Sequence, residues 1–261
     1  MLILKGFLIG IGKIIPGVSG SLLAISLGVY DKAINSLVNL SNNFKENIYF
    51  LGKLAIGVVI AIMFFSNVIA YLLNSHYLYT MSLFIGLILG TVPSIIKRIK
   101  FTIKNLKYLI LSFLIIMLVN FFKFENSFNP DQSILNLIIV LILGMLDAFT
   151  TIIPGISGTA TFIMLGVYDF ILCLFSNPFS NLFFTICFGL GLILGIVIAS
   201  ILMNKLLRKY PSQMYQVILG FTGFAIVILF KDILSYLNCI NFFISLFLII
   251  IGFFLATFLD K

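Results

Sequence analysis

The feature that constrains the fold most is an internal repeat. Residues 14–31 (IIPGVSGSLLAISLGVYD) and residues 152–169 (IIPGISGTATFIMLGVYD) are identical at 12 of 18 aligned positions, at a constant offset of 138 residues. In a chain of this composition, chance would give about one or two identities. The correspondence continues weakly through glycines further along each copy. The chain is therefore predicted to consist of two homologous halves, residues 1–127 and 128–261.

The composition indicates the environment in which these halves fold. Of the 261 residues, 62% are hydrophobic and 9% are charged, whereas soluble domains contain about 25% charged residues. A domain of this size cannot bury so large an excess of apolar side chains. Each half also contains apolar segments close to the ~20 residues that a helix needs to cross a bilayer. An all-α integral membrane protein is predicted.

Each half begins with two apolar arms separated by the motif Pro-Gly-x-Ser-Gly. The arms are residues 2–15 and 20–30 in the first half, and residues 134–153 and 158–168 in the second half. Proline and glycine interrupt a helix, and the second arm is too short to cross a bilayer. Each pair of arms is therefore predicted to form a re-entrant helical hairpin, over about residues 2–31 and 134–169. Irregular backbone at this depth must be buried in protein or line a wet cavity.

Three longer apolar segments follow each hairpin and are predicted to be transmembrane helices. They are residues 48–73, 78–96 and 106–122 in the first half, and residues 181–204, 213–230 and 240–259 in the second half. Because three is an odd number of crossings, the second half is predicted to be inverted relative to the first. Both chain termini are then expected on the same side of the membrane.

The distribution of charge supports this topology independently. The N-terminus, the loops 31–53, 97–107 and 205–211, and the C-terminus carry 14 of the 16 Lys and Arg residues, but three of the eight acidic residues. The positive-inside rule places this side in the cytoplasm. The net charge of +8 therefore reflects loop orientation, and no nucleic-acid partner is predicted.

The residues that usually bind metals and cofactors are sparse. The chain has three cysteines without CxxC spacing and a single histidine, His76. This pattern indicates neither a disulfide scaffold nor a zinc site. No metal and no cofactor are predicted.

The two motifs have the chemistry of an anion site. Ser19 and Ser157 stand where N-cap residues of the second arms would stand. A helix N-terminus presents free N–H groups and partial positive charge, which suit phosphate or carboxylate. The candidate site residues are Pro16, Gly17, Ser19, Gly20 and Ser21 in the first motif, and Pro154, Gly155, Ser157, Gly158 and Thr159 in the second. The alternative is that each motif only makes a tight turn for helix packing, but two inverted copies favour a binding site.

Charged residues within or next to the arms are further candidates. Lys13 lies in an otherwise apolar arm and is either a functional cation or a lysine that reaches the interface. Asp147 can pair with Lys13 across the two halves, carry a coupling proton or sodium ion, or lie at the outer interface. Asp31 and Asp169 are expected to mark the ends of the shorter arms. Arg208 is mainly an orientation signal, with headgroup binding or coupling as the alternative role.

The twin motifs resemble a known family. Ile14 to Gly20 with Gly28-Val29-Tyr30, and Ile152 to Thr159 with Gly166-Val167-Tyr168, are similar to a prokaryotic membrane family that was long catalogued as a domain of unknown function. This family is assigned as polyprenyl-phosphate translocases, named PopT, and the resemblance covers nearly the whole chain. It implies a flippase in the bacterial cytoplasmic membrane that returns undecaprenyl phosphate from the outer to the inner leaflet for reuse in cell-wall synthesis. In the family a small polar or acidic residue usually stands at the position of Lys13, and Gly-Thr at Gly20-Ser21.

Two other functions are consistent with inverted hairpins. Membrane-embedded undecaprenyl-diphosphate phosphatases carry a PGxSRS-type motif, but here Gly158 takes the place of the arginine. The two glutamates, Glu46 and Glu125, both lie in predicted loops, so a general acid or base inside the membrane is missing. The chain is therefore predicted not to be an enzyme. A transporter of small anions is the other alternative, and it would need a closed aqueous vestibule instead of a groove open to lipid.

Overall fold

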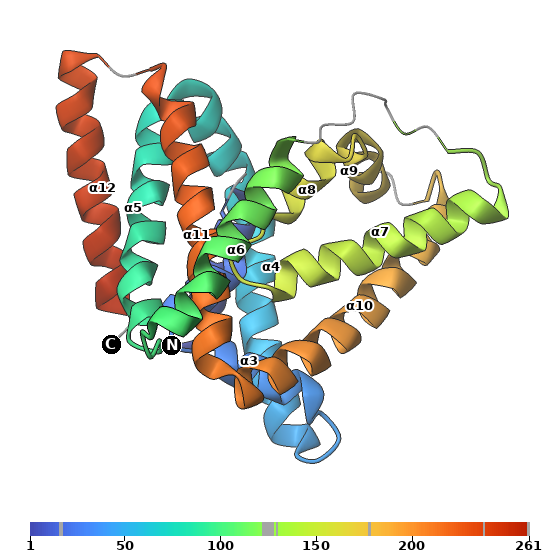
Figure 1. The fold of residues 1–261 in the computed structure, drawn as a ribbon. Coiled ribbons are helices and arrows are strands. Elements are labelled where there is room, and N and C mark those ends of the chain that lie inside the picture. The colour runs from blue at the N-terminus through green and yellow to red at the C-terminus, as the bar shows by residue number, and fades with distance from the viewer. Residues whose placement is uncertain (16–17, 122–127, 129, 177–178, 237, 260–261) are drawn as a thin grey trace.

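The computed structural model describes residues 1–15, 18–121, 128, 130–176, 179–236 and 238–259. All regular structure in these residues is helical (Figure 1), which confirms the predicted all-α class. The first half contains α1 (Leu2–Ile14), α2 (Gly20–Ser26), α3 (Tyr30–Val38), α4 (Phe44–Ser75), α5 (Tyr77–Ile96) and α6 (Ile103–Phe121). The second half contains α7 (Ile134–Ile152), α8 (Gly158–Met164), α9 (Tyr168–Ser176), α10 (Leu182–Lys209), α11 (Pro211–Leu234) and α12 (Cys239–Leu259).

The helices of the two halves correspond one to one in order. The first helix of each half ends at a repeat position, Ile14 or Ile152, and helix resumes at Gly20 or Gly158. The short helices that follow the motif, α2 and α8, both have 7 residues. The sequence repeat therefore appears as a repeat of helix boundaries, with each chain break at the Pro-Gly-x-Ser-Gly motif.

The segment after each short helix differs from the prediction. Residues 31–53 were expected to form a loop, but they contain α3 and the first turns of α4. The chain turns between α2 and α3 at Gly28, with φ of 66°, and between α8 and α9 at Gly166, with φ of 67°. Asp31 and Asp169 consequently lie in the first turn of α3 and α9 and do not end the preceding helices. Acidic residues are favourable there because the first turn of a helix is the positive end of its dipole.

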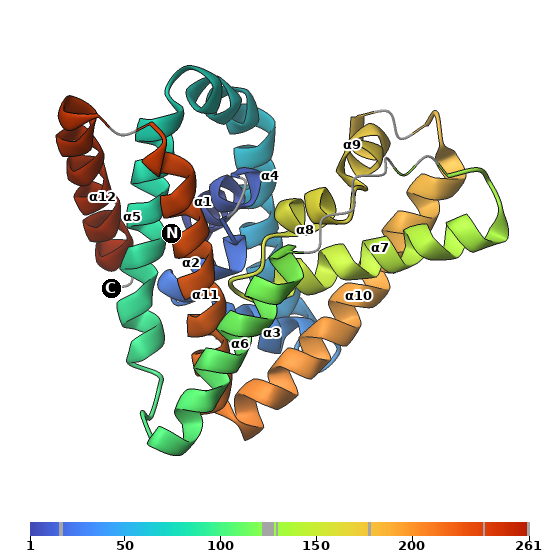
Figure 2. The ribbon, with the colours of Figure 1, turned by 45° about the horizontal axis from the view of Figure 1, so that its top comes forward.

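Within the described residues, six helices are long and apolar enough to cross a membrane: α4, α5, α7, α10, α11 and α12. The chain is therefore a multi-pass membrane protein. The six transmembrane segments predicted from the sequence included α6 and did not include α7, which was predicted to be the first arm of a re-entrant hairpin. The described apolar stretch of α6, Asn105–Val119, is shorter than a full span, whereas α7 has 19 residues. Figures 1 and 2 nevertheless show α7 lying across the direction of α5 and α12, and not alongside them.

Repeated glycines mark the helix crossings. The helix α1 packs on α4, and α7 packs on α10. A Cβ atom on Gly6 would lie 2.2 Å from a backbone oxygen of α4, and one on Gly144 would lie 2.2 Å from a backbone oxygen of α10. Gly57 on α4 and Gly195 on α10 make the reciprocal close approaches. These two repeat pairs are therefore explained by backbone contact, as is common between membrane helices.

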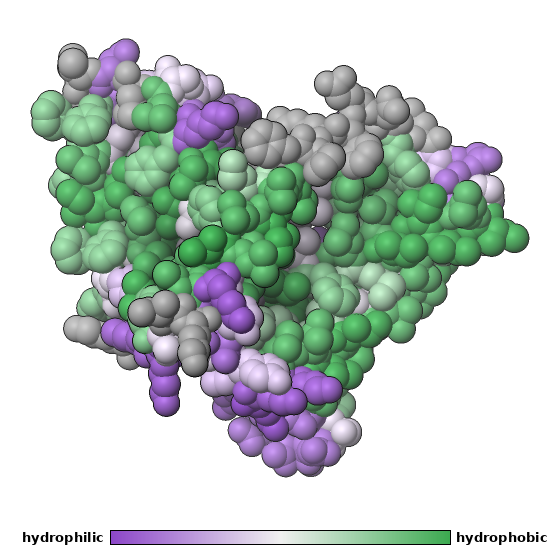
Figure 3. Space-filling view, in the orientation of Figure 1, coloured by the Kyte–Doolittle hydropathy of each residue, from purple (hydrophilic) through white to green (hydrophobic). Residues whose placement is uncertain are grey.

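The surface is largely hydrophobic, and the loops group at two opposite ends of the molecule. Most of the face in Figure 3 is hydrophobic, and large side chains such as Phe64, Phe243 and Phe254 are at least 64% exposed. The α3–α4, α5–α6 and α10–α11 connections lie at the lower end in Figure 1, as do the start of α1 and the end of α12. The α4–α5 turn lies at the upper end. This grouping agrees with the one used in the charge argument. Which end faces the cytoplasm remains a prediction.

Candidate functional site

One cavity lies between the two motifs. It has a volume of about 220 Å³ and is called the central cavity below. Its walls include eight residues that the sequence predicted for the site: Lys13, Ser19, Gly20, Ser21, Asp147, Ser157, Gly158 and Thr159. The lining also includes Tyr30 and Ile34 from α3, and Thr150 and Thr151 from α7. The fold thus brings together two segments that are 138 residues apart in the sequence.

In the second motif the polar groups lie against the backbone. Ser157 is the N-cap residue of α8, and its Oγ accepts a hydrogen bond from the backbone N–H three residues later at 3.4 Å. Gly155 has φ of 91°, a conformation that favours glycine. A Cβ atom on Gly158 would lie 2.8 Å from Thr150 Oγ1 and 3.0 Å from Asp147 Oδ1. The hydroxyl of Thr150 and the carboxylate of Asp147 therefore sit directly beside the motif. Pro154 is buried.

In the first motif the hydroxyl groups bond to each other. Ser19 occupies the N-cap position of α2, as predicted, but its Oγ lies 2.8 Å from the Oγ of Ser21 and makes no capping bond. Both serines are buried, with exposures of 5% and 8%. Pro16 and Gly17 lie outside the described residues. Because α2 and α8 are so short, their dipoles are weak, and hydroxyl and N–H groups are the main donors that the motifs offer.

Two opposite charges face the central cavity from different halves. Lys13 is exposed near the end of α1, and in the described part of the chain its ammonium group donates no hydrogen bond. By contrast, Lys5 on the same helix donates to the backbone oxygen of Leu27 at 2.6 Å. The positive charge of Lys13 acts on the carboxylate of Asp147. Lys13 is therefore available to a ligand in the cavity, whereas Lys5 caps α2.

Tyr30 was not predicted as a site residue. It is buried in the cavity wall, and its Oη donates to the backbone oxygen of Ile152 at 2.8 Å. This bond joins α3 of the first half to the last turn of α7 in the second half. In the sequence, Tyr30 was noted only as part of the segment that resembles the family. Its place in the repeated Gly-Val-Tyr-Asp sequence was the signal that could have identified it.

An apolar groove adjoins the central cavity on the second-half side. It has a volume of about 80 Å³ and lies between α6, α8 and α11, where Ile116, Met164, Phe224 and Ile228 line it. Ser157 and its neighbour Ile156 line both the groove and the central cavity. The central cavity, which holds the charged and hydroxyl groups, and the apolar groove therefore meet at the second motif.

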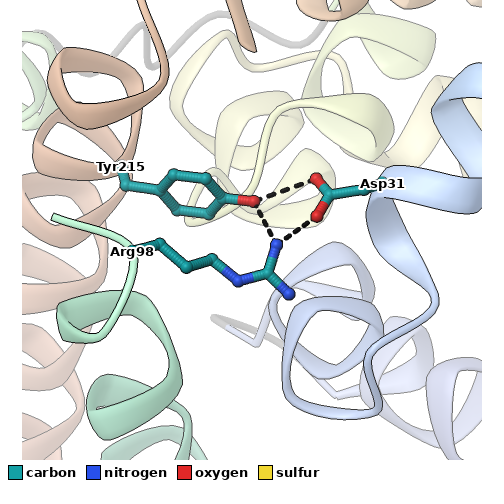
Figure 4. A network of polar contacts seen from close by, with 3 residues as sticks. All are labelled: Asp31, Arg98 and Tyr215. Carbon is teal, nitrogen blue, oxygen red and sulfur yellow. Dashed lines mark hydrogen bonds and ion pairs between the residues drawn. The ribbon is translucent and has the colours of Figure 1, made fainter. Parts of the chain in front are cut away.

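Arg208 lies apart from the central cavity. It lines a second pocket of about 520 Å³, called the arginine pocket below, together with Asp31, Arg98 and Tyr215. Figure 4 shows that Arg98 Nη1 contacts the carboxylate of Asp31 and donates to Tyr215 Oη at 2.6 Å, while Tyr215 Oη donates to Asp31 Oδ1 at 2.9 Å. Arg208 Nη2 donates to Asn35 Oδ1 at 2.6 Å.

The environment keeps Arg98 charged. Partial burial lowers the pKa of the guanidinium group, but the charges and hydrogen bonds of Tyr215 and Asp31 act in the opposite direction and prevail. The net effect raises the pKa above its ordinary value. The arginine pocket contains the guanidinium groups of Arg98 and Arg208 and the carboxylate of Asp31.

The fold and the cavities define a multi-pass helical membrane protein with a cavity that both similar halves line and that contains charged and hydroxyl groups. Residues 9–241 match the profile of the VCA0040-like family, described as undecaprenyl phosphate translocase-like, and the chain belongs to this family. The family description and the names of the relatives indicate a transporter and not an enzyme, as the sequence predicted.

Two curated relatives are similar over different lengths. A polyprenyl-phosphate transporter of Staphylococcus aureus is 29% identical over 271 aligned positions, which cover 99% of this chain and 95% of the relative. A polyprenyl-phosphate transporter of Vibrio cholerae is 27% identical over 180 positions, which cover 63% of this chain and 56% of the relative. No solved structure matches the chain.

Proposed function

We propose that this protein is a flippase that returns undecaprenyl phosphate from the outer to the inner leaflet of the bacterial cytoplasmic membrane. The phosphate headgroup binds in the central cavity between the two Pro-Gly-x-Ser-Gly motifs, and the polyprenyl chain stays in an apolar environment. The observation that carries the proposal is the convergence of Lys13, Ser19 and Ser157 on one cavity. The family and the names of the curated relatives give independent support for polyprenyl phosphate as the substrate.

The cavity has the donors that a phosphate requires. Lys13 supplies a positive charge, and Ser21 and Thr159 add hydroxyl groups beside the two N-cap serines. Hydrogen bonds to a charged group contribute about 1.5–3 kcal/mol each. Gly20 and Gly158 let α2 and α8 lie close to α1 and α7, since a side chain at Gly20 would meet the backbone oxygen of Ile9 and one at Gly158 would overlap Thr150 and Asp147.

The apolar groove favours a lipid over a small anion. A small anion needs only a polar vestibule, whereas a phosphorylated lipid needs a polar site that continues into an apolar channel. The groove between α6, α8 and α11 is such a continuation, because Ser157 borders both spaces. The phosphatase alternative is disfavoured since Gly158, and not an arginine, follows Ser157.

Charge is the basis for assigning the orientation of the protein in the membrane and a candidate coupling residue. The basic loops α3–α4, α5–α6 and α10–α11 lie at one end, and we assign this end to the cytoplasm by the positive-inside rule. The two halves then act as inverted repeats around a site near the middle of the membrane. Asp147 is the candidate coupling residue, taking up a proton or a sodium ion, because it is the acidic residue of the central cavity.

Transport in proteoliposomes tests the proposal. Purified protein is reconstituted with labelled undecaprenyl phosphate, and movement between leaflets is measured with undecaprenyl phosphate or inorganic phosphate as competitor. We expect transport that unlabelled lipid suppresses and that inorganic phosphate suppresses weakly. Transport of inorganic phosphate itself would support the small-anion alternative. Release of phosphate from undecaprenyl diphosphate, above that of empty vesicles, would support the enzyme.

A further inference from the structure

We propose that the arginine pocket is a second phosphate-binding site, which takes a phosphate monoester group at the end of the molecule formed by α3, α10 and the α5–α6 segment. The proposal rests on the proposed function, since the lipid headgroup would reach this site before or after the central cavity. It adds a second binding position along the path of the headgroup.

The use of arginine in this chain is selective. The chain contains 14 lysines and two arginines, and both arginines, Arg98 and Arg208, line this one pocket. Orientation in the membrane requires only positive charge, which lysine supplies elsewhere in the loops. A guanidinium group differs from an ammonium group because its planar fork donates two parallel hydrogen bonds to a phosphate. The pairing of both arginines in one pocket therefore indicates recognition of a phosphate.

The two guanidinium groups come from different halves and are held in place. Arg98 follows α5 and is fixed by Asp31 and by the hydroxyl of Tyr215 at 2.6 Å. Arg208 is in the last turn of α10 and is fixed by Asn35 at 2.6 Å. Partners of this kind orient a binding group before the ligand arrives, which reduces the entropy lost on binding.

The carboxylate of Asp31 binds Arg98 at the position where we propose that a phosphate binds. This carboxylate neutralises one of the two positive charges, so the side chains of the pocket carry one net positive charge. A phosphate monoester carries between one and two negative charges at neutral pH. When such a group binds, it competes with Asp31 for Arg98 and binds Arg208 as well. Asp31 therefore sets the affinity of the pocket low enough for release.

The pocket is one helix away from the central cavity. Ile34 on α3 lines both spaces, and the adjacent residues Tyr30 and Asp31 face the central cavity and the arginine pocket, respectively. A headgroup that moves between the two sites therefore has to pass only the wall that α3 forms. Tyr30 also ties this wall to α7 through the backbone oxygen of Ile152.

The corresponding pocket in the second half lacks these features. It has a volume of about 330 Å³ and contains Asp169 and Cys173, the repeat counterparts of Asp31 and Asn35. Since both arginines of the chain line the arginine pocket, only one end of the molecule has a pair of guanidinium groups. The phosphate site is therefore specific to one end of the transport path.

Binding measurements in phosphatidylcholine nanodiscs test the site in a chain whose central cavity is blocked by Gly158→Val, or weakened by Ser157→Ala if the valine variant does not insert. Undecaprenyl phosphate is titrated, with undecaprenol as the uncharged control ligand. We expect residual binding of the phosphate lipid that falls at least tenfold in Arg208→Gln. The affinity of Arg208→Lys should lie between those of the blocked chain and of Arg208→Gln, because lysine keeps the positive charge but cannot donate two parallel hydrogen bonds. Lys209→Gln removes the same charge one residue away and should change nothing.

The variant Asp31→Asn distinguishes a phosphate-binding site from a cluster of contacts that only stabilises the packing of the helices. If the pocket binds phosphate, removing the competing carboxylate tightens binding. Weaker or unchanged binding in Asp31→Asn, absence of residual binding in the blocked chain, or equal binding in Arg208→Gln and Lys209→Gln would each overturn the proposal. Competition by inorganic phosphate identifies a site that accepts the free ion, and competition by the lipid alone identifies a headgroup site. Normal binding and transport in Gly158→Val would refute the central cavity, while the arginine pocket would still be judged by Arg208→Gln.

Discussion

The two hairpins share a sequence motif and helix boundaries, but they pack differently. In the first half, α2 packs against α5 and α12, and Ser26 Oγ donates to the backbone oxygen of Ala256 at 3.2 Å. The cavity left at this contact is about 40 Å³. In the second half, the corresponding face of α8 borders the apolar groove of about 80 Å³ between α6 and α11. One copy of the hairpin is therefore closed by its neighbours, and the other leaves a space that suits an apolar chain.

The two halves also differ in the charges they bring to the central cavity. Lys13 in the first half corresponds to Thr151 in the second, and Asp147 in the second half corresponds to Ile9 in the first. All four residues line the cavity. Duplication thus accounts for its walls, whereas later substitutions account for its charges.

The largest expected effect concerns the inverted arrangement of the halves. In a chain whose three cysteines are replaced by serine, Asn42→Cys and Gln132→Cys place single thiols at exposed positions in the two halves. We expect a membrane-impermeant maleimide to label Asn42→Cys only from the cytoplasmic side and Gln132→Cys only from the outer side. Labelling of both from the same side would mean that the halves are not inverted.

The second largest effect is expected at the motif glycines. In Gly158→Val the new side chain would overlap Thr150 Oγ1 and Asp147 Oδ1, and the closest contact of a Cβ at Gly20 is a backbone oxygen of α1 at 3.0 Å. We expect transport to fall at least about 100-fold in Gly158→Val, corresponding to about 2.7 kcal/mol, and less in Gly20→Val. The amount of inserted protein is measured in parallel. An equal effect of both valines would remove the predicted difference between the hairpins.

Lys13 is expected to contribute to affinity, in contrast to Lys5. Lys13→Gln removes a cation that faces the central cavity, whereas Lys5→Gln removes the cap on Leu27. We expect the apparent affinity for undecaprenyl phosphate to fall about tenfold in Lys13→Gln, since a hydrogen bond to a charged group contributes about 1.5–3 kcal/mol. Lys5→Gln should lower thermal stability without changing affinity. Normal transport by Lys13→Gln would mean that the Lys13 side chain extends to the membrane interface and does not bind the substrate.

Asp147 is expected to act in the opposite direction. Its carboxylate lies beside Gly158 in the motif that we propose binds the phosphate, and two like charges about 4 Å apart repel by about 1 kcal/mol even in water. Asp147→Asn should therefore raise the affinity for the phosphate lipid on the order of fivefold. If Asp147 also carries the coupling ion, the same variant loses the dependence of transport on pH or sodium. Reduced affinity in Asp147→Asn would assign the carboxylate to substrate binding.

Much of the helical frame was predictable because it depends on local sequence. The breaks at Ile14 and Ile152 follow from Pro-Gly, and the apolar segments follow from composition. The helix α3 was missed because residues 31–53 are more polar than a membrane span, although Asp31 is a favourable residue at a helix start. The length of α7 was predicted, but its orientation across α5 depends on packing and not on hydropathy.

The site was predictable only as far as the repeat reached. The motif residues and the two unusual charges, Lys13 and Asp147, stood out in apolar arms, and all the described ones except Pro154 and Gly155 line the central cavity. The repeated Gly-Val-Tyr-Asp sequence could have drawn attention to Tyr30. The bonds of Tyr30 and Arg98 could not be predicted, because their partners, Ile152 and Tyr215, are distant in sequence. Contacts of this kind depend on how the halves pack, which a single sequence does not encode in any local pattern.

The central claim is that the two motifs hold one phosphate headgroup between them. The most direct test is the rate of transport as a function of undecaprenyl phosphate concentration for Ser19→Ala, Ser157→Ala and the double variant, at inserted amounts matched to the unchanged protein. Ser157→Ala should weaken apparent affinity about tenfold, because it loses a cap and a phosphate donor. Ser19→Ala should weaken it less, since Ser21 retains a hydroxyl at the same place, and the double variant should be the weakest. Normal affinity in the double variant would contradict the claim.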